Sequence, residues 1–180
     1  QTFRNFEFII FSDASTDGSE KIIHAYEDSR IKFVRNTDNQ GNYPSRNKGL
    51  KMATGKYICV MDADDVAYPH RFDVQYRYLE NHPDVLAVGT HYDFSIQGKT
   101  MKRNLPLSYE DVQIALLSDN HFLHSSLMVR TEAMRKIGGY DEKYVYSSDY
   151  DLLSRLALSG KIENLPDILM MYRLHDTQIS

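Results

Sequence analysis

Short apolar runs alternate with segments of helical spacing along the first half of the chain. The runs at residues 6–11, 31–34 and 56–61 predict buried strands, because they are short, rich in β-branched and aromatic residues, and bounded by turn residues. Between them, Asp17 precedes a segment typical of a helix start, and residues 45–53 predict a second helix. This alternation is typical of a mostly parallel sheet flanked by helices, so the predicted fold class is α/β.

The second half has a less regular pattern. Apolar runs predict further strands at residues 85–89, 126–129 and 168–173, and a hairpin that pairs residues 92–96 with 100–103 around Gly98. Ser108 with Asp111 predicts a capped helix whose apolar residues are Val112, Leu116 and Leu117. Another helix is expected over residues 149–159. No repeat, low-complexity tract or linker divides the chain, which predicts one domain.

Composition and charge narrow the class of protein. The net charge of −4 argues against general affinity for nucleic acid. Cys59 is the single cysteine, so no disulfide framework is expected and a reducing compartment fits. No apolar run is long enough to span a bilayer, and no signal peptide is visible. These features predict a cytoplasmic location, which includes the inner face of a membrane if other segments or partners hold the chain there.

Three carboxylates follow the strand predicted over residues 56–61. Asp62, Asp64 and Asp65 lie almost side by side in the sequence, and no basic residue adjoins them. Like charges this close repel one another, and a cation relieves that repulsion. Hard divalent ions such as Mg²⁺ bind one or two carboxylates together with phosphate oxygens of a substrate. Because Asp13 also ends a predicted strand, where such sheets bind ligands, the sequence predicts a metal–phosphate site at this edge.

Several short segments are individually weak signals but specific when they occur in one order. They are Ser12-Asp13-Ala14-Ser15-Thr16-Asp17-Gly18-Ser19, Ser45-Arg46-Asn47-Lys48-Gly49 with Ala53-Thr54-Gly55, Asp62-Ala63-Asp64-Asp65, Gly138-Gly139-Tyr140-Asp141-Glu142, Ser148-Asp149-Tyr150-Asp151 and Tyr172-Arg173-Leu174-His175. In this order they resemble the family 2 glycosyltransferases, which have the GT-A fold. The resemblance implies a single domain over residues 1–180, with a nucleotide-binding half at about residues 1–66 and an acceptor half at about residues 67–180.

The resemblance implies a role for each candidate on the donor side. Asp13 would hydrogen-bond the nucleobase, and Asp62 the ribose or the base. Arg46 would contact the diphosphate or a carboxylate. Asp64 would hold Mn²⁺ or Mg²⁺ against the diphosphate. His175 would join Asp64 at the metal, or else it is a structural histidine.

Asp149 is the candidate general base, because an acceptor hydroxyl needs a positioned carboxylate to take its proton. Its place at a predicted helix start also fits a structural role, since the helix macrodipole favours an acidic residue there. Asp151 is the second choice for the base. Asp65 fits either a supporting contact or a solvated turn. An acceptor pocket or a structural role, in the core or at the rim, fits several further residues: His121, His124, Tyr140, Tyr144 and Tyr146.

The implied activity is that of a metal-dependent, inverting glycosyltransferase of the hexosyltransferase type. It would move a sugar from a nucleotide-diphospho-sugar, expected to be UDP-linked, to a hydroxyl of a glycan or lipid-linked sugar in cell-surface polysaccharide synthesis. The chain lacks the Gln-x-x-Arg-Trp motif of the family's processive polymerases, so a single addition is expected. A sugar nucleotidyltransferase is the rival enzyme, although no Gly-rich phosphate loop is visible.

The sequence departs from the family pattern in three places. Ser12 stands where the family has an Asp, and Ser148 stands where it has a Glu. The family's first strand and most of its first helix have no counterpart before Gln1. The chain is therefore expected to be N-terminally incomplete, and a non-catalytic fragment that binds sugar nucleotides is the remaining hypothesis.

Overall fold

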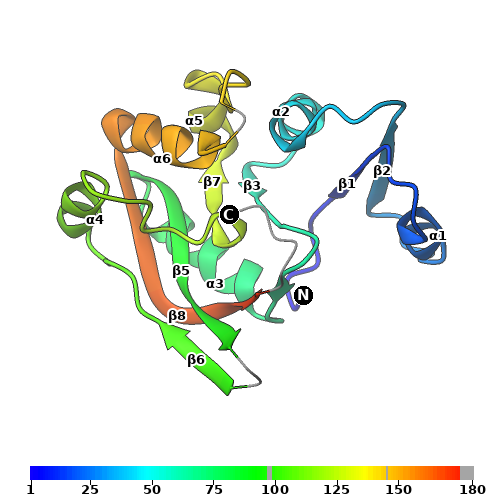
Figure 1. Ribbon diagram of the computed structural model, residues 1–180. Coiled ribbons are helices and arrows are strands. Elements are labelled where there is room, and N and C mark those ends of the chain that lie inside the picture. Colours follow the sequence, from blue (N-terminus) through cyan, green and yellow to red (C-terminus); the bar gives the residue numbers. More distant parts are fainter. Residues whose placement is uncertain (97–98, 145, 175–180) are drawn as a thin grey trace.

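The structure is a computed structural model that describes residues 1–96, 99–144 and 146–174. Its strands form two sheets (Figure 1). The smaller sheet pairs β1 (Phe8–Asp13) in parallel with β2 (Ile31–Asn36). The larger sheet has the order β3-β7-β5-β8-β4, and β6 pairs with the outer stretch of β5. Its strands are β3 (Tyr57–Cys59), β4 (Val66–Ala67), β5 (Val85–Ile96), β6 (Lys99–Arg103), β7 (Met128–Arg130) and β8 (Lys161–Arg173).

The expectation of a mostly parallel sheet is wrong for the larger sheet. Among its described strands only β5 and β8 pair in parallel, whereas β3–β7, β4–β8, β5–β6 and β5–β7 are antiparallel. The regular alternation of strand and helix ends after β3, and β5 then turns directly into β6, which forces antiparallel pairing. Apolar periodicity locates a strand but not the direction of its neighbour. The α/β class and the parallel β1–β2 pair agree with the prediction.

Helices cover both faces of the larger sheet (Figure 1). On one face, α6 (Ser148–Ser159) packs its fully buried leucines against Ala87 and Val129. On the other, α3 (Arg71–Asn81) packs Leu79 with Val88 and Met128. Neighbouring residues of a strand point to opposite faces, so these two clusters form separate layers of the core. The remaining helices are α1 (Ser19–His24), α2 (Asn42–Met52), α4 (Tyr109–Ala115), the 3₁₀ turn η1 (His124–Ser126) and α5 (Thr131–Lys136).

Several local predictions can be compared with these elements. The cap of α4 is confirmed, because Ser108 Oγ accepts a hydrogen bond from Asp111 N over 3.1 Å. The placement of Leu117 in this helix is wrong: α4 ends at Ala115, and Leu117 lies beyond it and is 86% exposed. The hairpin of β5 and β6 is confirmed, and its Gly98 lies outside the described residues. No helix in the described part of the chain combines the length and apolar character needed to cross a membrane.

Candidate functional site

The turn that carries Asp62, Asp64 and Asp65 follows β3 and is closed by a hydrogen bond from Asp65 N to the carbonyl of Asp62. The Asp65 carboxylate is buried and accepts hydrogen bonds from Ser125 Oγ and from Arg173 N. Burial raises the pKa of Asp65, and these two hydrogen bonds oppose the rise. Asp65 therefore ties the turn to η1 and β8, and it is not a solvated turn residue.

Asp62 is the point at which the turn meets the rest of the candidate site. Its carboxylate forms an ion pair with Arg46 of α2. Burial raises the pKa of Asp62, Arg46 lowers it, and the charges of Asp65, Asp64 and Asp149 raise it further. The carboxylates of the turn and Arg46 therefore form one charged cluster, and Asp149 is close enough for its charge to act on Asp62.

Two arginines from distant parts of the sequence contact this turn. Arg46 pairs with Asp62, and Arg173 Nε donates to the backbone carbonyl of Asp64. A third, Arg71, follows the turn by six residues and is fully buried; it donates to the carbonyls of Val60 and Leu127. Burial lowers the pKa of Arg71, and the charge of Asp62 opposes that effect. These cations offset part of the repulsion among the carboxylates, although the pKa values of Asp62 and Asp65 remain raised.

Two aromatic rings lie beside the Arg46 guanidinium. Its central carbon lies 6.0 Å from the ring centre of Tyr43 and 5.7 Å from that of Tyr140, and the two rings stack at 5.5 Å. Tyr140 Oη lies 2.8 Å from His124 Nε2. Burial raises the pKa of Tyr140, and burial together with Arg46 lowers that of His124 well below its usual value. Both groups are therefore neutral at pH 7. A chain of polar contacts links Asp62 through Arg46 and Tyr140 to His124.

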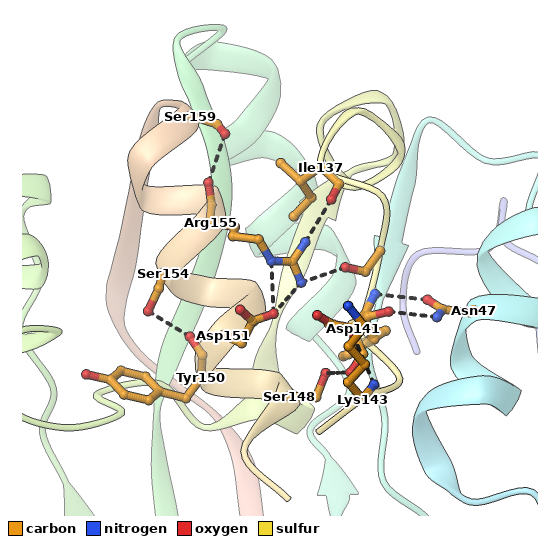
Figure 2. A network of polar contacts seen from close by, with 12 residues as sticks. Asn47, Ile137, Asp141, Lys143, Ser148, Tyr150, Asp151, Ser154, Arg155 and Ser159 are labelled. Carbon is orange, nitrogen blue, oxygen red and sulfur yellow. Dashed lines mark hydrogen bonds and ion pairs between the residues drawn. The ribbon is translucent and has the colours of Figure 1, made fainter. Parts of the chain in front are cut away.

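The turn that presents Tyr140 is held from both sides (Figure 2). Asn47 Nδ2 donates to the carbonyl of Tyr140, and Asn47 Oδ1 accepts from Tyr140 N, each over 2.9 Å. Arg155 pairs with Asp151 at 2.6 Å and donates to the carbonyl of Gly139 over 2.8 Å. Gly139 has φ +73°, and a Cβ there would lie 2.5 Å from Asn47 Oδ1, so the turn requires glycine. A cavity of about 770 Å³ adjoins these residues.

Asp149 lies in the first turn of α6, after Ser147, whose φ of +62° starts the helix abruptly. Its Oδ2 accepts a hydrogen bond from Asn120 Nδ2 over 3.0 Å. Its charge also raises the pKa of Tyr43, so it faces the aromatic group around Arg46. Asp151, the second choice for the base, is instead engaged with Arg155.

Asp13 lies at the end of β1, as predicted, but its carboxylate contacts a different part of the chain. It accepts hydrogen bonds from Asn36 Nδ2, Gln40 N and Gly41 N at 2.7, 3.0 and 2.8 Å. Burial raises its pKa, and these hydrogen bonds more than offset the rise, so the pKa lies below its usual value. Within the described residues Asp13 makes no hydrogen bond or ion pair to the acidic turn. The structure thus places Arg46, Asp62, Asp64 and Asp149 near one another, whereas Asp13, at the end of β1, is bonded to the loop that holds Gln40 and Gly41.

The residues suit a divalent ion only in combination with a substrate. No group of three His, Cys, Asp or Glu side chains that could hold a metal occurs in the described part of the chain, and His175 lies outside it. Mg²⁺ is commonly held by one or two carboxylates with phosphate oxygens completing the shell. The hard carboxylate oxygens of the turn fit that arrangement, with Asp64 as the predicted ligand.

Sequence reasoning missed several residues of the site. Tyr43 is one helical turn before Arg46, a spacing that signals a shared face. Asn120 and Ser125 gave no comparable signal, because each reaches its carboxylate from a segment far away in sequence. Their roles follow only from the tertiary fold.

Comparison with known proteins identifies the class. The family described as "Glycosyl transferase family 2" matches residues 1–138, and the chain belongs to this family. The resemblance read from its motifs is thereby confirmed.

Individual relatives extend the match over the rest of the chain. An uncharacterized glycosyltransferase of Methanocaldococcus jannaschii is 35% identical over 181 residues, which cover 97% of this chain and 62% of that protein. The amylovoran biosynthesis glycosyltransferase AmsE of Erwinia amylovora is 34% identical over 137 residues, covering 75% of this chain and 51% of that protein. The chain thus spans about half to three-fifths of the length of these curated relatives.

Solved structures show the same fold. S. aureus TarS in complex with UDP-GlcNAc superposes with a TM-score of 0.79 at 18% identity, covering 96% of this chain and 51% of that chain. Mannosyltransferase PcManGT from Pyrobaculum calidifontis, in complex with GDP-Man and Mn²⁺, gives 0.71 at 20% identity, covering 95% and 48%. At these identities the likeness concerns the fold alone.

Proposed function

We propose that this chain is the catalytic domain of an inverting glycosyltransferase that moves a sugar from a UDP-sugar to an acceptor hydroxyl in cell-surface polysaccharide synthesis. The observation that carries the proposal is that Arg46 joins the acidic turn to the Tyr43–Tyr140 pair, and that Asp149 is close enough for its charge to act on both Asp62 and Tyr43. The UDP-GlcNAc complex of TarS supports the donor class, and the amylovoran role of AmsE supports the kind of product.

In the proposed reaction Asp149 acts as the general base. Its carboxylate takes the proton of the acceptor hydroxyl while that oxygen attacks the anomeric carbon from the side opposite the diphosphate. The bond from the anomeric carbon to the diphosphate oxygen breaks, and configuration inverts. Asn120 holds one carboxylate oxygen of Asp149, which fixes its orientation and leaves the other oxygen for the proton.

The donor would lie against the residues around Arg46. Arg46 has a guanidinium that fits diphosphate oxygens, and the Tyr43–Tyr140 pair restricts where it can point. Asp62 would hydrogen-bond the ribose or the base and hold Arg46 in place. Asp13 would read the base, for which it exchanges a loop hydrogen bond for one to the ligand.

A divalent ion is part of the proposal. Asp64, with His175, would hold Mn²⁺ or Mg²⁺, as the Mn²⁺ complex of PcManGT suggests for a protein of this fold. When bound, the ion supplies positive charge that stabilises the diphosphate as a leaving group.

The donor and metal assignments are tested by calorimetry with UDP-, GDP- and dTDP-sugars in the presence and absence of Mn²⁺. We expect binding of UDP-sugar that needs Mn²⁺ and is lost in Asp64→Ala. Asp84→Ala is the matched control, because Asp84 is a surface carboxylate paired with Lys161. Unchanged UDP-sugar affinity in Asp64→Ala would rule out the metal assignment.

The base assignment is tested by Asp149→Asn, which keeps the size and the hydrogen bond from a neighbour but takes no proton. We expect UDP-sugar affinity to stay within about twofold and the transfer rate to fall by about 10²–10⁴-fold, measured as UDP release with an acceptor glycan present. Asp151→Asn serves as the comparison. Full loss of transfer in Asp151→Asn with near-normal transfer in Asp149→Asn would move the base to Asp151.

A further inference from the structure

β6 is a basic strand on the surface of an acidic protein. All five of its residues are exposed, and three of them, Lys99, Lys102 and Arg103, are cations. None of the three takes part in the ion pairs found among the described residues. The whole chain carries a net charge of −4. β6, at the outer edge of the sheet (Figure 1), is therefore a local positive surface available to an anion from outside the fold.

Cross-strand pairing sorts these cations onto two faces. Arg103 lies opposite Tyr92, and Lys102 lies opposite Asp93. Residues directly opposite each other share a face, and successive residues of a strand point to opposite faces. Arg103 therefore shares its face with Tyr92 and Phe94, as does Lys99, while Lys102 lies on the reverse face.

The face with Arg103 is aromatic and borders the candidate site. The ring centre of Tyr92 lies 6.3 Å from that of Phe94 and 5.9 Å from that of Tyr172 in β8. Burial raises the pKa of Tyr92, with Arg103 opposing the rise and Asp65 adding to it. Burial raises the pKa of Tyr172 as well, and Asp65 adds to that rise. Arg173, the residue after Tyr172, donates its N–H to Asp65 Oδ1 over 3.2 Å, so this face extends from the basic strand to the acidic turn.

We propose that this face binds a phosphate-bearing saccharide as the acceptor. Arg103 would hold the phosphate, since guanidinium groups bind phosphate with two parallel hydrogen bonds, and Lys99 on the same face would add positive charge nearby. The half-buried rings of Tyr92 and Tyr172 offer apolar surface to the C–H face of a sugar ring. A further hydroxyl of the acceptor would then extend toward the turn and Asp149. This inference rests on the proposed function, because it names the acceptor of that reaction.

The test is an NMR titration of the 180-residue chain with α-glucose 1-phosphate, with glucose and inorganic phosphate as separate arms. We expect glucose 1-phosphate to shift the Tyr92, Phe94 and Tyr172 ring signals at concentrations about fivefold lower than either part alone. Arg103→Gln should weaken that binding about tenfold, as expected for loss of a charge-assisted hydrogen bond. Lys102→Gln makes the same change in charge on the reverse face and should alter affinity less than twofold.

Three results would overturn the inference. If Arg103→Gln and Lys102→Gln weaken glucose 1-phosphate binding equally, the cause is a general electrostatic attraction to the hairpin and not a site on one face. Binding to phosphatidylglycerol vesicles without any shift by glucose 1-phosphate would make the hairpin a membrane contact. Binding of inorganic phosphate as tight as that of glucose 1-phosphate would remove the role of the rings. UDP-sugar calorimetry in parallel separates the two proposals, since donor binding without glucose 1-phosphate binding leaves the proposed function standing.

Discussion

The two sheets of this molecule are stabilised by different kinds of contact. The larger sheet and its helices enclose a core of apolar side chains, among which the α6 residues Leu152, Leu153 and Leu156 are all 0% exposed. Around the smaller sheet, α1 has no buried residue, Ile22 is 63% exposed and Phe8 is 44% exposed. Most of the apolar free energy of folding therefore comes from the larger sheet and its helices.

The smaller sheet is joined to the rest of the fold largely by polar contacts at its two ends. Before β1, the Glu7 carboxylate accepts a hydrogen bond from Thr54 N over 2.7 Å, and Lys32 of β2 holds the same carboxylate from within the smaller sheet over 2.6 Å. After β1, Asp13 accepts hydrogen bonds from the backbone of Gln40 and Gly41. Polar contacts are directional but contribute little net stability, so this region is expected to open locally before the larger sheet unfolds.

The two sheets therefore differ in what they contribute: the smaller sheet carries a family motif, and the larger sheet supplies most of the stability. The segment with the most recognisable motif, around Asp13, belongs to the more exposed sheet. The buried leucines of α6 belong to no family motif, yet the same helix carries Asp149. A rigid mount for the proposed base and a more open segment for the proposed nucleotide contact would suit a reaction in which the donor must enter and leave.

The largest expected effect on the free energy of unfolding comes from truncating one apolar side chain in each region. Leu156→Ala should lower the free energy of unfolding by about 2–5 kcal/mol, because it leaves a cavity in a fully packed core. Ile22→Ala removes a comparable side chain that is mostly exposed, and the loss should stay below about 0.5 kcal/mol. Urea denaturation at pH 7 measures both. Similar losses for the two variants would show that the sheets do not differ as described.

Much of the fold was predictable from local pattern. Strands β1, β2 and β3, the hairpin of β5 and β6 and the start of α6 all follow from apolar periodicity and turn residues. The first seven residues of β8 were missed, because Asn164 and Pro166 interrupt the apolar run there. The antiparallel pairing in the larger sheet was also missed, since tertiary packing decides which strands pair and in which direction.

The candidate site was predictable in its residue types more than in its contacts. The order of motifs indicated Arg46 and Asp62, but their direct ion pair depends on how α2 packs beside β3. The burial of Asp65 depends on Ser125 and on Arg173, which come from η1 and the end of β8. A charge pattern in sequence cannot reveal partners that the fold brings from so far.

The smaller expected effect concerns the polar contacts of Glu7. Its pKa is lowered from 4.5 to about 2, chiefly by hydrogen bonds from Lys32 and from Thr54 N. A lowered pKa in the folded state gives stability that is complete above about pH 4.5 and is lost as pH falls toward 2. Glu7→Gln should therefore cost about 1–2 kcal/mol at pH 7, and urea denaturation should show the gap to the unsubstituted chain narrowing between pH 5 and about pH 3.

The same substitution should also reveal where that stability acts. Hydrogen exchange in β1 should accelerate in Glu7→Gln, because the contact between Glu7 and Thr54 N joins this strand to the loop before β3. Asp28→Asn is the matched control: the pKa of Asp28 is also lowered to about 2, but its partner Arg30 is two residues away, so it joins no separate parts of the fold. Exchange in β1 that responds equally to both variants, or a stability gap that stays constant with pH, would contradict a docking role for Glu7.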